Sequence, residues 1–404
     1  MRQISLIALM VIGLMTITAC GSGSSPISPE REAETVFGNQ YVVLGYNDLG
    51  MHCINQDFSE LAVLPPFNNL YAQVIRRGDD PQIVTSGVTI NYSILGNTHS
   101  ADKSNFWTYL HNLGIPIPNN IGLTGHGMSG SMVLAAGRND WVVDGIPITP
   151  VMDNGTLNPY PLSSIKVYQG GALKATTEAV VPVSWEMSCN LCHNTPGYTT
   201  ARDVLHRHDV LHGTHLEAKQ PKPVICGSCH RQPPLEPLGL HGNPNLPTLS
   251  RAMHHAHANR MGPVMGATGG IECYACHPGL QTKCYRDVHF AKGFKCTYCH
   301  GSMATVANPA REPWAQEPRC GSCHNRLGWE YEQPNTLFRN SLGHQGIHCE
   351  ACHGSPHAIA PTNQANDNWQ SINAQGHAGT IDNCLVCHTQ LPDDQFPHRY
   401  SGGG

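Results

Sequence analysis

Between residues 36 and 185, apolar positions follow a two-residue period that stops at clusters of turn residues. The runs YVVLGYND, QIVTSGVTINYSIL, DWVVDGIPITPV and TTEAVVPVSWEM are rich in β-branched residues, and turn sequences such as DNGTLNPYP separate them. Short alternating segments of this kind are typical of antiparallel β structure. We therefore expect an N-terminal all-β domain over residues 36–185, an antiparallel sandwich-like or barrel-like unit that serves packing or partner docking.

Beyond this region the alternation disappears, and only two stretches have clear helical spacing. In TARDVLHRHDVLHG, Thr200 opens a capping box and Gly213 provides a stop. In TLSRAMHHAHANRMG, Ser250 is the expected N-cap and Gly262 the stop. The pattern predicts two short helices joined by irregular chain.

The composition limits the size of any aliphatic core. Of 404 residues, 40% are hydrophobic and 13% charged, while 41 are Gly and 30 are Pro. Such a chain is poorly suited to long helices. Its net charge of −5 and the lack of a basic patch argue against a nucleic-acid partner. The unusual counts are 17 Cys and 25 His, and they call for an explanation that also supplies the missing core.

The first 20 residues have the form of an export signal. After Arg2, an apolar run over residues 4–17 is too short for a membrane span and leads to Cys20. This ending resembles a bacterial lipobox and predicts a signal peptide over 1–19, lipidation of Cys20 and a flexible tether over 20–35. An ordinary secretion signal is the alternative. We expect an exported protein in an oxidising compartment: an outer-membrane lipoprotein on the periplasmic or cell-surface face, or an extracellular protein.

Seven copies of C-x-x-C-H use 14 of the 17 cysteines. The motif is the attachment signature of c-type haem, because two thiols on one side of a short turn bind the vinyl groups and the next residue places an imidazole on the iron. The predicted haem-attaching cysteines are Cys189, Cys192, Cys226, Cys229, Cys273, Cys276, Cys296, Cys299, Cys320, Cys323, Cys349, Cys352, Cys384 and Cys387. The predicted proximal ligands are His193, His230, His277, His300, His324, His353 and His388.

Structural zinc and a disulfide framework are the alternatives. Zinc knuckles pair up and need no histidine after the second cysteine, whereas here the number of motifs is odd and every motif ends in His. Seven haem c groups over residues 189–388 leave about 29 residues for each haem. We therefore expect a haem-cored domain over residues 186–400, with short helices and little regular secondary structure.

Each iron has a second axial position, and many spare histidines compete for it. His254 and His257 share one face of a predicted helix, where they suit two adjacent haems. His208 and His212 share a face of the other helix, and we rank His212 higher. His357 follows a Gly-Ser-Pro turn that directs it toward a neighbouring haem. The distal candidates are His212, His254, His257, His289, His344, His357 and His377, with His241, His348 and His398 in reserve.

The stretches CEACHGSPHA, CYACHPG followed by CYRDVHFAKGFKCTYCHG, and LHGTHL resemble the multihaem c-type cytochromes of metal-reducing and related anaerobic bacteria. The resemblance covers roughly residues 186–400. It implies closely stacked haems with histidine on both sides of the iron. Some members of this group are outer-membrane lipoproteins, and others assemble into extracellular filaments.

Three functions remain open. An electron-transfer protein would relay electrons from periplasmic donors to other cytochromes or to extracellular metal oxide or quinone acceptors, while its lipid anchor holds it to the membrane. A multihaem reductase of nitrogen or sulfur oxyanions would need one open iron, and the C-x-x-C-K motif that some such enzymes use is absent from the sequence. A filament subunit would self-assemble. We favour the electron carrier over the enzyme.

Cys53 and Cys284 remain once the motif cysteines and Cys20 are assigned. A disulfide between them is one interpretation. His52 as a distal ligand, Cys53 as an axial thiolate, and a merely buried pair of thiols are the others.

Overall fold

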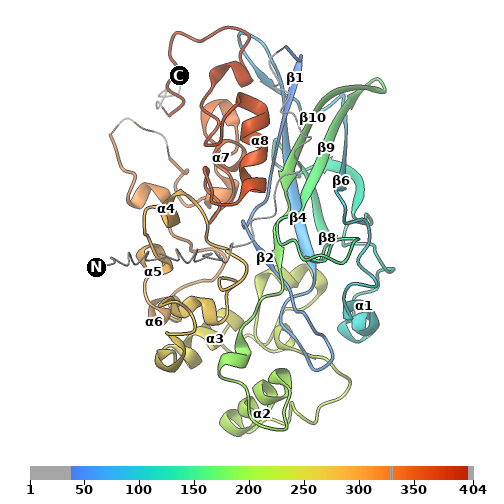
Figure 1. The fold of residues 1–404 in the computed structure, drawn as a ribbon, viewed down its shortest axis with the longest axis vertical. Coiled ribbons are helices and arrows are strands. Elements are labelled where there is room, and N and C mark those ends of the chain that lie inside the picture. Colours follow the sequence, from blue (N-terminus) through green and yellow to red (C-terminus); the bar gives the residue numbers. More distant parts are fainter. Residues whose placement is uncertain (1–37, 328, 330, 399–404) are drawn as a thin grey trace, which may run out of the picture. The chain divides into compact units, whose positions relative to one another are not determined.

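The computed structural model describes residues 38–327, 329 and 331–398, so the predicted signal peptide, Cys20 and the tether lie outside the described residues (Figure 1). An antiparallel sheet occupies the N-terminal part, in the order β1-β4-β8-β7-β6-β9-β10, with β5 paired to β4. Its strands are β1 (Tyr41–Tyr46), β4 (Phe67–Arg76), β5 (Gln82–Ile83), β6 (Thr89–Ile94), β7 (Ser129–Leu134), β8 (Trp141–Pro147), β9 (Leu162–Gln169) and β10 (Ala172–Val180).

The sheet curls until its edge strands β1 and β10 meet, and it is nearly closed into a barrel. A Cβ atom built on Gly45 of β1 would lie 2.7 Å from the Cβ of Ala179 in β10. Across this seam, Gln370 of α8 (Ala365–Gln375) accepts a hydrogen bond from the Gly45 N–H at 2.7 Å and donates one to the Gly45 carbonyl at 3.0 Å. The prediction of antiparallel β structure is confirmed, and of the two expected forms the structure has the barrel-like one, because a single sheet curls until β1 and β10 meet.

Strand β1 is buried on both faces, which explains its unbroken apolar sequence. Val43 belongs to the core inside the barrel. Val42 and Leu44 belong to a second cluster outside it, together with Ala351 and Val386 of the C-terminal segment. The barrel is therefore the wall against which the last two C-x-x-C-H motifs pack.

The C-terminal segment contains short helices and little other regular structure, as expected. The α-helices here are α2 (Thr200–His212), α3 (Leu249–His257), α4 (Val288–Ala291), α5 (Cys296–His300), α6 (Met303–Val306), α7 (Cys349–His353) and α8. The 3-10 helices here are η2 (Cys189–Leu191), η3 (Cys226–Ser228), η4 (Pro233–Leu238), η5 (Gly262–Val264), η6 (Glu272–Ala275), η7 (Cys320–Ser322), η8 (Phe338–Asn340), η9 (His344–Gly346) and η10 (Cys384–Val386). The remaining elements are α1 (Phe106–Tyr109), η1 (Leu110–Leu113), β2 (His52–Cys53), β3 (Leu61–Ala62), β11 (Val183–Ser184) and β12 (Val224–Ile225).

Both predicted helices form, with shifted starts. Thr199 caps α2 by accepting a hydrogen bond from the Arg202 N–H, and Gly213 ends this helix in the left-handed conformation, as predicted. Thr248, not Ser250, caps α3, and this helix ends at His257, before the predicted stop. In both cases a threonine upstream of the expected cap has its hydroxyl within reach of the N–H three residues on.

Candidate functional site

All seven C-x-x-C-H motifs fold into the same kind of single turn. In five of them the histidine N–H donates to the carbonyl of the first cysteine at 2.8–2.9 Å, and the other two form the one-turn helices α5 and α7. Such a turn brings both thiols to one side of the backbone and projects the imidazole beyond them. The local geometry that thioether attachment needs is thus repeated seven times.

A second histidine lies opposite each motif histidine. Each of these partners comes from outside the motif that it faces. The pairs, with the distances between ring centres, are His193–His257 (6.3 Å), His230–His208 (6.3 Å), His277–His254 (6.2 Å), His300–His357 (5.9 Å), His324–His289 (6.1 Å), His353–His398 (5.6 Å) and His388–His344 (6.3 Å).

These separations match the spacing of two imidazoles on one metal. With metal–nitrogen bonds of about 2.0 Å and a ring nitrogen about 1.1 Å from its ring centre, two opposed rings have centres about 6 Å apart. A haem supplies four nitrogens of its own, so it needs only two protein ligands. Within the described ranges, no group of three or more His, Cys, Asp or Glu side chains could hold a bare metal ion. The donor set of paired imidazoles beside paired thiols therefore fits a haem.

Hydrogen bonds at Nδ1 orient many of these rings. His254 and His257 each donate from Nδ1 to the backbone carbonyl four residues earlier, at 2.7 Å, and His230 donates to the Pro247 carbonyl at 2.8 Å. His208 has its Nδ1 2.8 Å from the Thr214 hydroxyl. A ring that carries its proton on Nδ1 presents the lone pair of Nε2, which is the arrangement of a metal-binding histidine.

Burial keeps several paired rings uncharged. It lowers the pKa of His277, His353 and His357 to about 4, and the imidazole of the pairing partner adds to each shift. Bringing a positive charge into a poorly hydrated site is costly, so these rings are neutral at physiological pH. The neutral form is the one that can bind iron.

Two other histidines show the contrast. His52 is buried and uses both nitrogens within the fold, with Nε2 2.9 Å from Asp48 and Nδ1 3.2 Å from the Phe67 carbonyl oxygen. His348 is 2% exposed, and its Nε2 faces Asp140 at 3.3 Å. Both nitrogens of His52 thus have partners beside the barrel, which argues against its use as a distal ligand.

The structure places most predicted distal candidates beside a motif histidine. Those that lie there are His254, His257, His289, His344 and His357. His212 is exposed, and its ring contact is with His208 at 4.8 Å. His377 is also exposed and has its Nε2 3.4 Å from Asp382. The two remaining motif histidines are instead faced by His208, the lower-ranked residue of its pair, and by the reserve candidate His398.

The pairs cross from one part of the chain to another. His357 follows His353 by only four residues, yet its ring lies beside His300. On α3, His254 and His257 face the motifs of His277 and His193, and their Cα atoms are about 4.5 Å apart along the helix axis. The two pairs that share α3 are therefore neighbours in space, as the sequence led us to expect.

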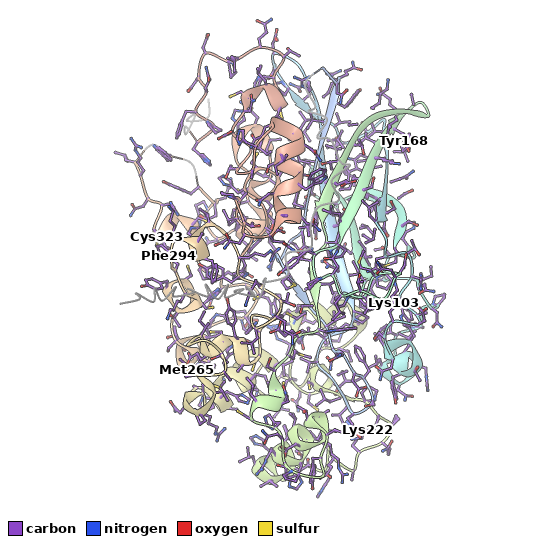
Figure 2. All side chains as sticks on the ribbon, in the orientation of Figure 1. Lys103, Tyr168, Lys222, Met265, Phe294 and Cys323 are labelled. Atoms are coloured by element: carbon purple, nitrogen blue, oxygen red, sulfur yellow. The ribbon has the colours of Figure 1, made fainter. Side chains whose placement is uncertain are left out.

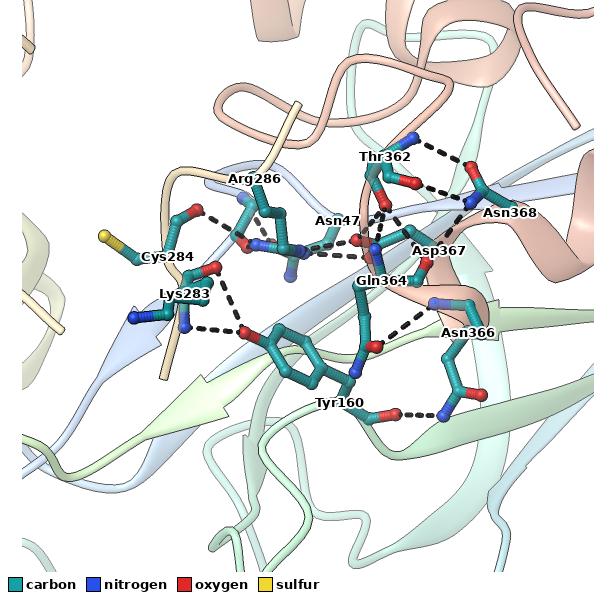
Figure 3. A network of polar contacts seen from close by, with 12 residues as sticks. Asn47, Tyr160, Lys283, Cys284, Arg286, Thr362, Gln364, Asn366, Asp367 and Asn368 are labelled. Carbon is teal, nitrogen blue, oxygen red and sulfur yellow. Dashed lines mark hydrogen bonds and ion pairs between the residues drawn. The ribbon is translucent and has the colours of Figure 1, made fainter. Parts of the chain in front are cut away.

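The turn that carries His357 is held in place by Gly50 and Arg286, for which the sequence predicted no role. His357 has a φ of 64°, and the Arg286 N–H donates to its carbonyl at 3.0 Å. Gly50 in DLGMHC lies under this turn, and a Cβ atom there would be 1.8 Å from the Pro356 carbonyl oxygen. The Arg286 guanidinium donates to the Gly50 carbonyl at 2.9 Å and to Asp367 at 2.9 Å (Figure 3). In the sequence, a glycine at position 50 is the one feature that could have indicated the close approach of the Pro356 carbonyl.

Several large apolar side chains near the histidine pairs are exposed to solvent. Leu211, which shares a face of α2 with His208, is 59% exposed, and Tyr298 within a motif is 70% exposed. Phe294 is 41% exposed and lies 6.0 Å from the ring of His289 (Figure 2). Exposed apolar groups at the pairs fit a surface that an apolar macrocycle covers.

Comparison with known proteins gives no further guide. No protein-family model, curated protein or solved structure matches this chain. Among the described residues, no helix has both the length and the apolar character that crossing a bilayer requires. The motifs and the histidine pairs are therefore the features that bear on function.

Proposed function

We propose that this chain is an electron-transfer protein that carries seven covalently attached haem c groups. The motif cysteines would form the thioethers, the motif histidines would be the proximal ligands, and the second histidine of each pair would be the distal ligand. Haem iron held by two imidazoles cycles between the ferrous and ferric states and exchanges single electrons. The protein residues position the rings, keep them neutral and exclude water from them.

One observation carries the proposal: each of the seven motif turns faces a second imidazole at 5.6–6.3 Å between ring centres. Seven coincident pairs supply both axial ligands at every motif. A reductase would need one motif without such a partner, so that a substrate could bind the iron. The complete set of pairs favours a carrier over a catalyst.

The proposal includes the cellular setting. With the export signal and a lipid on Cys20, the protein would be held at the outer membrane and would pass electrons between periplasmic donors and outer-surface cytochromes, metal oxide or quinones. Cys20→Ser should move the protein from the membrane fraction to the soluble exported fraction with its haem content unchanged. Retention in the membrane fraction would refute the anchor.

The deciding experiment combines a haem count with spin state. Pyridine haemochrome should give seven haems per chain, and low-temperature EPR of the ferric protein should give only low-spin signals. The reduced protein should not bind carbon monoxide. A high-spin signal of one haem per chain with carbon monoxide binding would support the reductase instead, and zinc without haem would refute both functions.

A further inference from the structure

The junction between the barrel and the C-terminal segment brings together the two cysteines that the haem motifs leave over. Cys53 lies in β2, which pairs in parallel with β11, so that Ser184 is the register partner of Cys53. The Ser184 hydroxyl contacts the Thr282 hydroxyl at 3.0 Å in a buried position. Thr282 precedes Cys284 by two residues, so this contact joins the two segments on one side of the thiols.

A second contact joins them on the other side. The Nη1 atom of Arg286 donates to the Gly50 carbonyl at 2.9 Å and to the Cys284 carbonyl at 3.0 Å. Those two oxygens therefore lie within about 6 Å of each other. Figure 3 shows the sulfur of Cys284 directed away from the guanidinium. Gly50 precedes Cys53 by three residues, so this contact ties the segment of Cys53 to the segment of Cys284 a few residues from each thiol.

The surroundings of the loop before Cys284 are rigid. The Glu186 carboxylate accepts hydrogen bonds from four consecutive backbone N–H groups, those of residues 279–282. The two shortest come from Thr282 at 2.5 Å and Leu280 at 2.7 Å. The Tyr160 hydroxyl accepts from the Lys283 N–H at 2.9 Å and donates to the Lys283 carbonyl at 3.0 Å. A loop held at this many points keeps Cys284 in a defined position at the junction.

The electrostatics place Cys53 within reach of the charge of Cys284. Burial, with the charges of a Cys284 thiolate and of Glu186 adding to it, raises the pKa of Cys53 to about 12. Burial likewise raises the pKa of Cys284 to about 12, and there the nearby Cys296 thiolate adds to the shift. A raised pKa keeps a thiol protonated and slow to react within the folded protein.

We propose that Cys53 and Cys284 form a disulfide that fastens the barrel to the haem-binding segment. Each thiol loses one proton and one electron as the S–S bond forms, and the disulfide of an exported thiol oxidase accepts the two electrons and two protons to become a dithiol. Such a bond requires Cα atoms about 4.4–6.8 Å apart, and it would hold at that separation two segments that the Ser184–Thr282 and Arg286–Gly50 contacts already join. The assignment of these two as the remaining thiols rests on the proposed haem attachment.

Peptide mass spectrometry on the full haem-loaded protein tests this inference. Cells are lysed under denaturing conditions with N-ethylmaleimide present, and the digest is analysed with and without a reductant. We expect one cross-linked peptide pair containing Cys53 and Cys284, with both residues labelled only when reduction precedes alkylation. Labelling of both without reduction, or a cross-link to another cysteine, would overturn the proposal.

A variant and a haem count keep the outcomes separate. Cys53→Ser should leave Cys284 labelled without reductant, which shows that the label can reach this residue. Thioethers resist reductants, so a failure of haem attachment would appear as labelled motif cysteines and a low haem count, whatever the state of Cys53. The inference and the proposed function can therefore fail independently.

Discussion

Replacing His208 with Ala should open one iron of seven, whereas the same change at His212 should open none. The two histidines are one turn apart on α2, and only His208 has its ring centre 6.3 Å from that of a motif histidine, His230. Its Nδ1 is held by the Thr214 hydroxyl at 2.8 Å. His212 is exposed at the end of the helix, which makes His212→Ala the matched control.

The size of the effect follows from the pairing. Removing one of fourteen paired imidazoles should convert one haem per chain to high spin and create one carbon monoxide site per chain in the reduced protein. The haem count should stay at seven, because His230 and both cysteines of that motif are unchanged. Losing the hydrogen bond to Thr214 should itself cost only about 1 kcal/mol, and the two thioethers and six other haems should keep the segment folded without this one distal bond.

The assay is quantitative EPR of the ferric variants, with carbon monoxide titration of the reduced forms. The ring of His212 is 4.8 Å from that of His208 and could replace it, so His208→Ala is also tested in combination with His212→Ala. In the double variant one open haem per chain is expected without exception. Seven low-spin haems in the double variant, or an open haem in His212→Ala alone, would refute the assignment of His208.

Three further predictions concern other parts of the molecule. His398→Ala should give one carbon monoxide site per chain and His377→Ala none, since only His398 faces a motif histidine; the reverse result in the same titration would exchange the two. Asp367→Asn should lower the free energy of unfolding by about 3–5 kcal/mol, measured by chemical denaturation, because it leaves the guanidinium of Arg286 buried and unpaired; an unchanged midpoint would contradict this. Burial raises the pKa of Glu350 well above its usual value, so this carboxyl costs the native protein stability as pH rises above about 4.5; Glu350→Gln should gain on the wild type by up to about 1.4 kcal/mol per pH unit, and parallel stability curves would be the contrary outcome.

The sequence predicted the features whose cause is local. The motif turns form because a cysteine, two further residues and a second cysteine suit one turn of chain wherever they occur. The strands follow from alternating β-branched runs, and α2 ends at Gly213 because that residue tolerates the left-handed conformation. Each of these outcomes depends on a few consecutive residues.

Features that depend on distant partners were not predictable in the same way. His208 and His212 share one helical face, so periodicity treats them alike, and the choice between them depends on Thr214 and on the place of the motif containing His230. The seam of the barrel is bridged to α8 by Gln370, which lies almost two hundred residues beyond the last large strand. His377 likewise could not be told apart from the paired histidines by sequence, and its ring lies beside Asp382.

Each histidine pair joins a motif to a stretch of chain outside that motif. These connections explain how the C-terminal segment can hold a defined fold with so little regular secondary structure. If each pair binds one haem, that haem joins its own motif to a distant stretch of chain, as with His300 and His357 or His388 and His344. The cofactor would then act as a cross-link as well as a redox group, and binding it would supply folding free energy that helices and an aliphatic core supply elsewhere. The barrel needs no such help, because its interior is a continuous apolar core. It can therefore serve as the preformed wall on which β1 positions the last motifs and Gly50 positions the turn of His357.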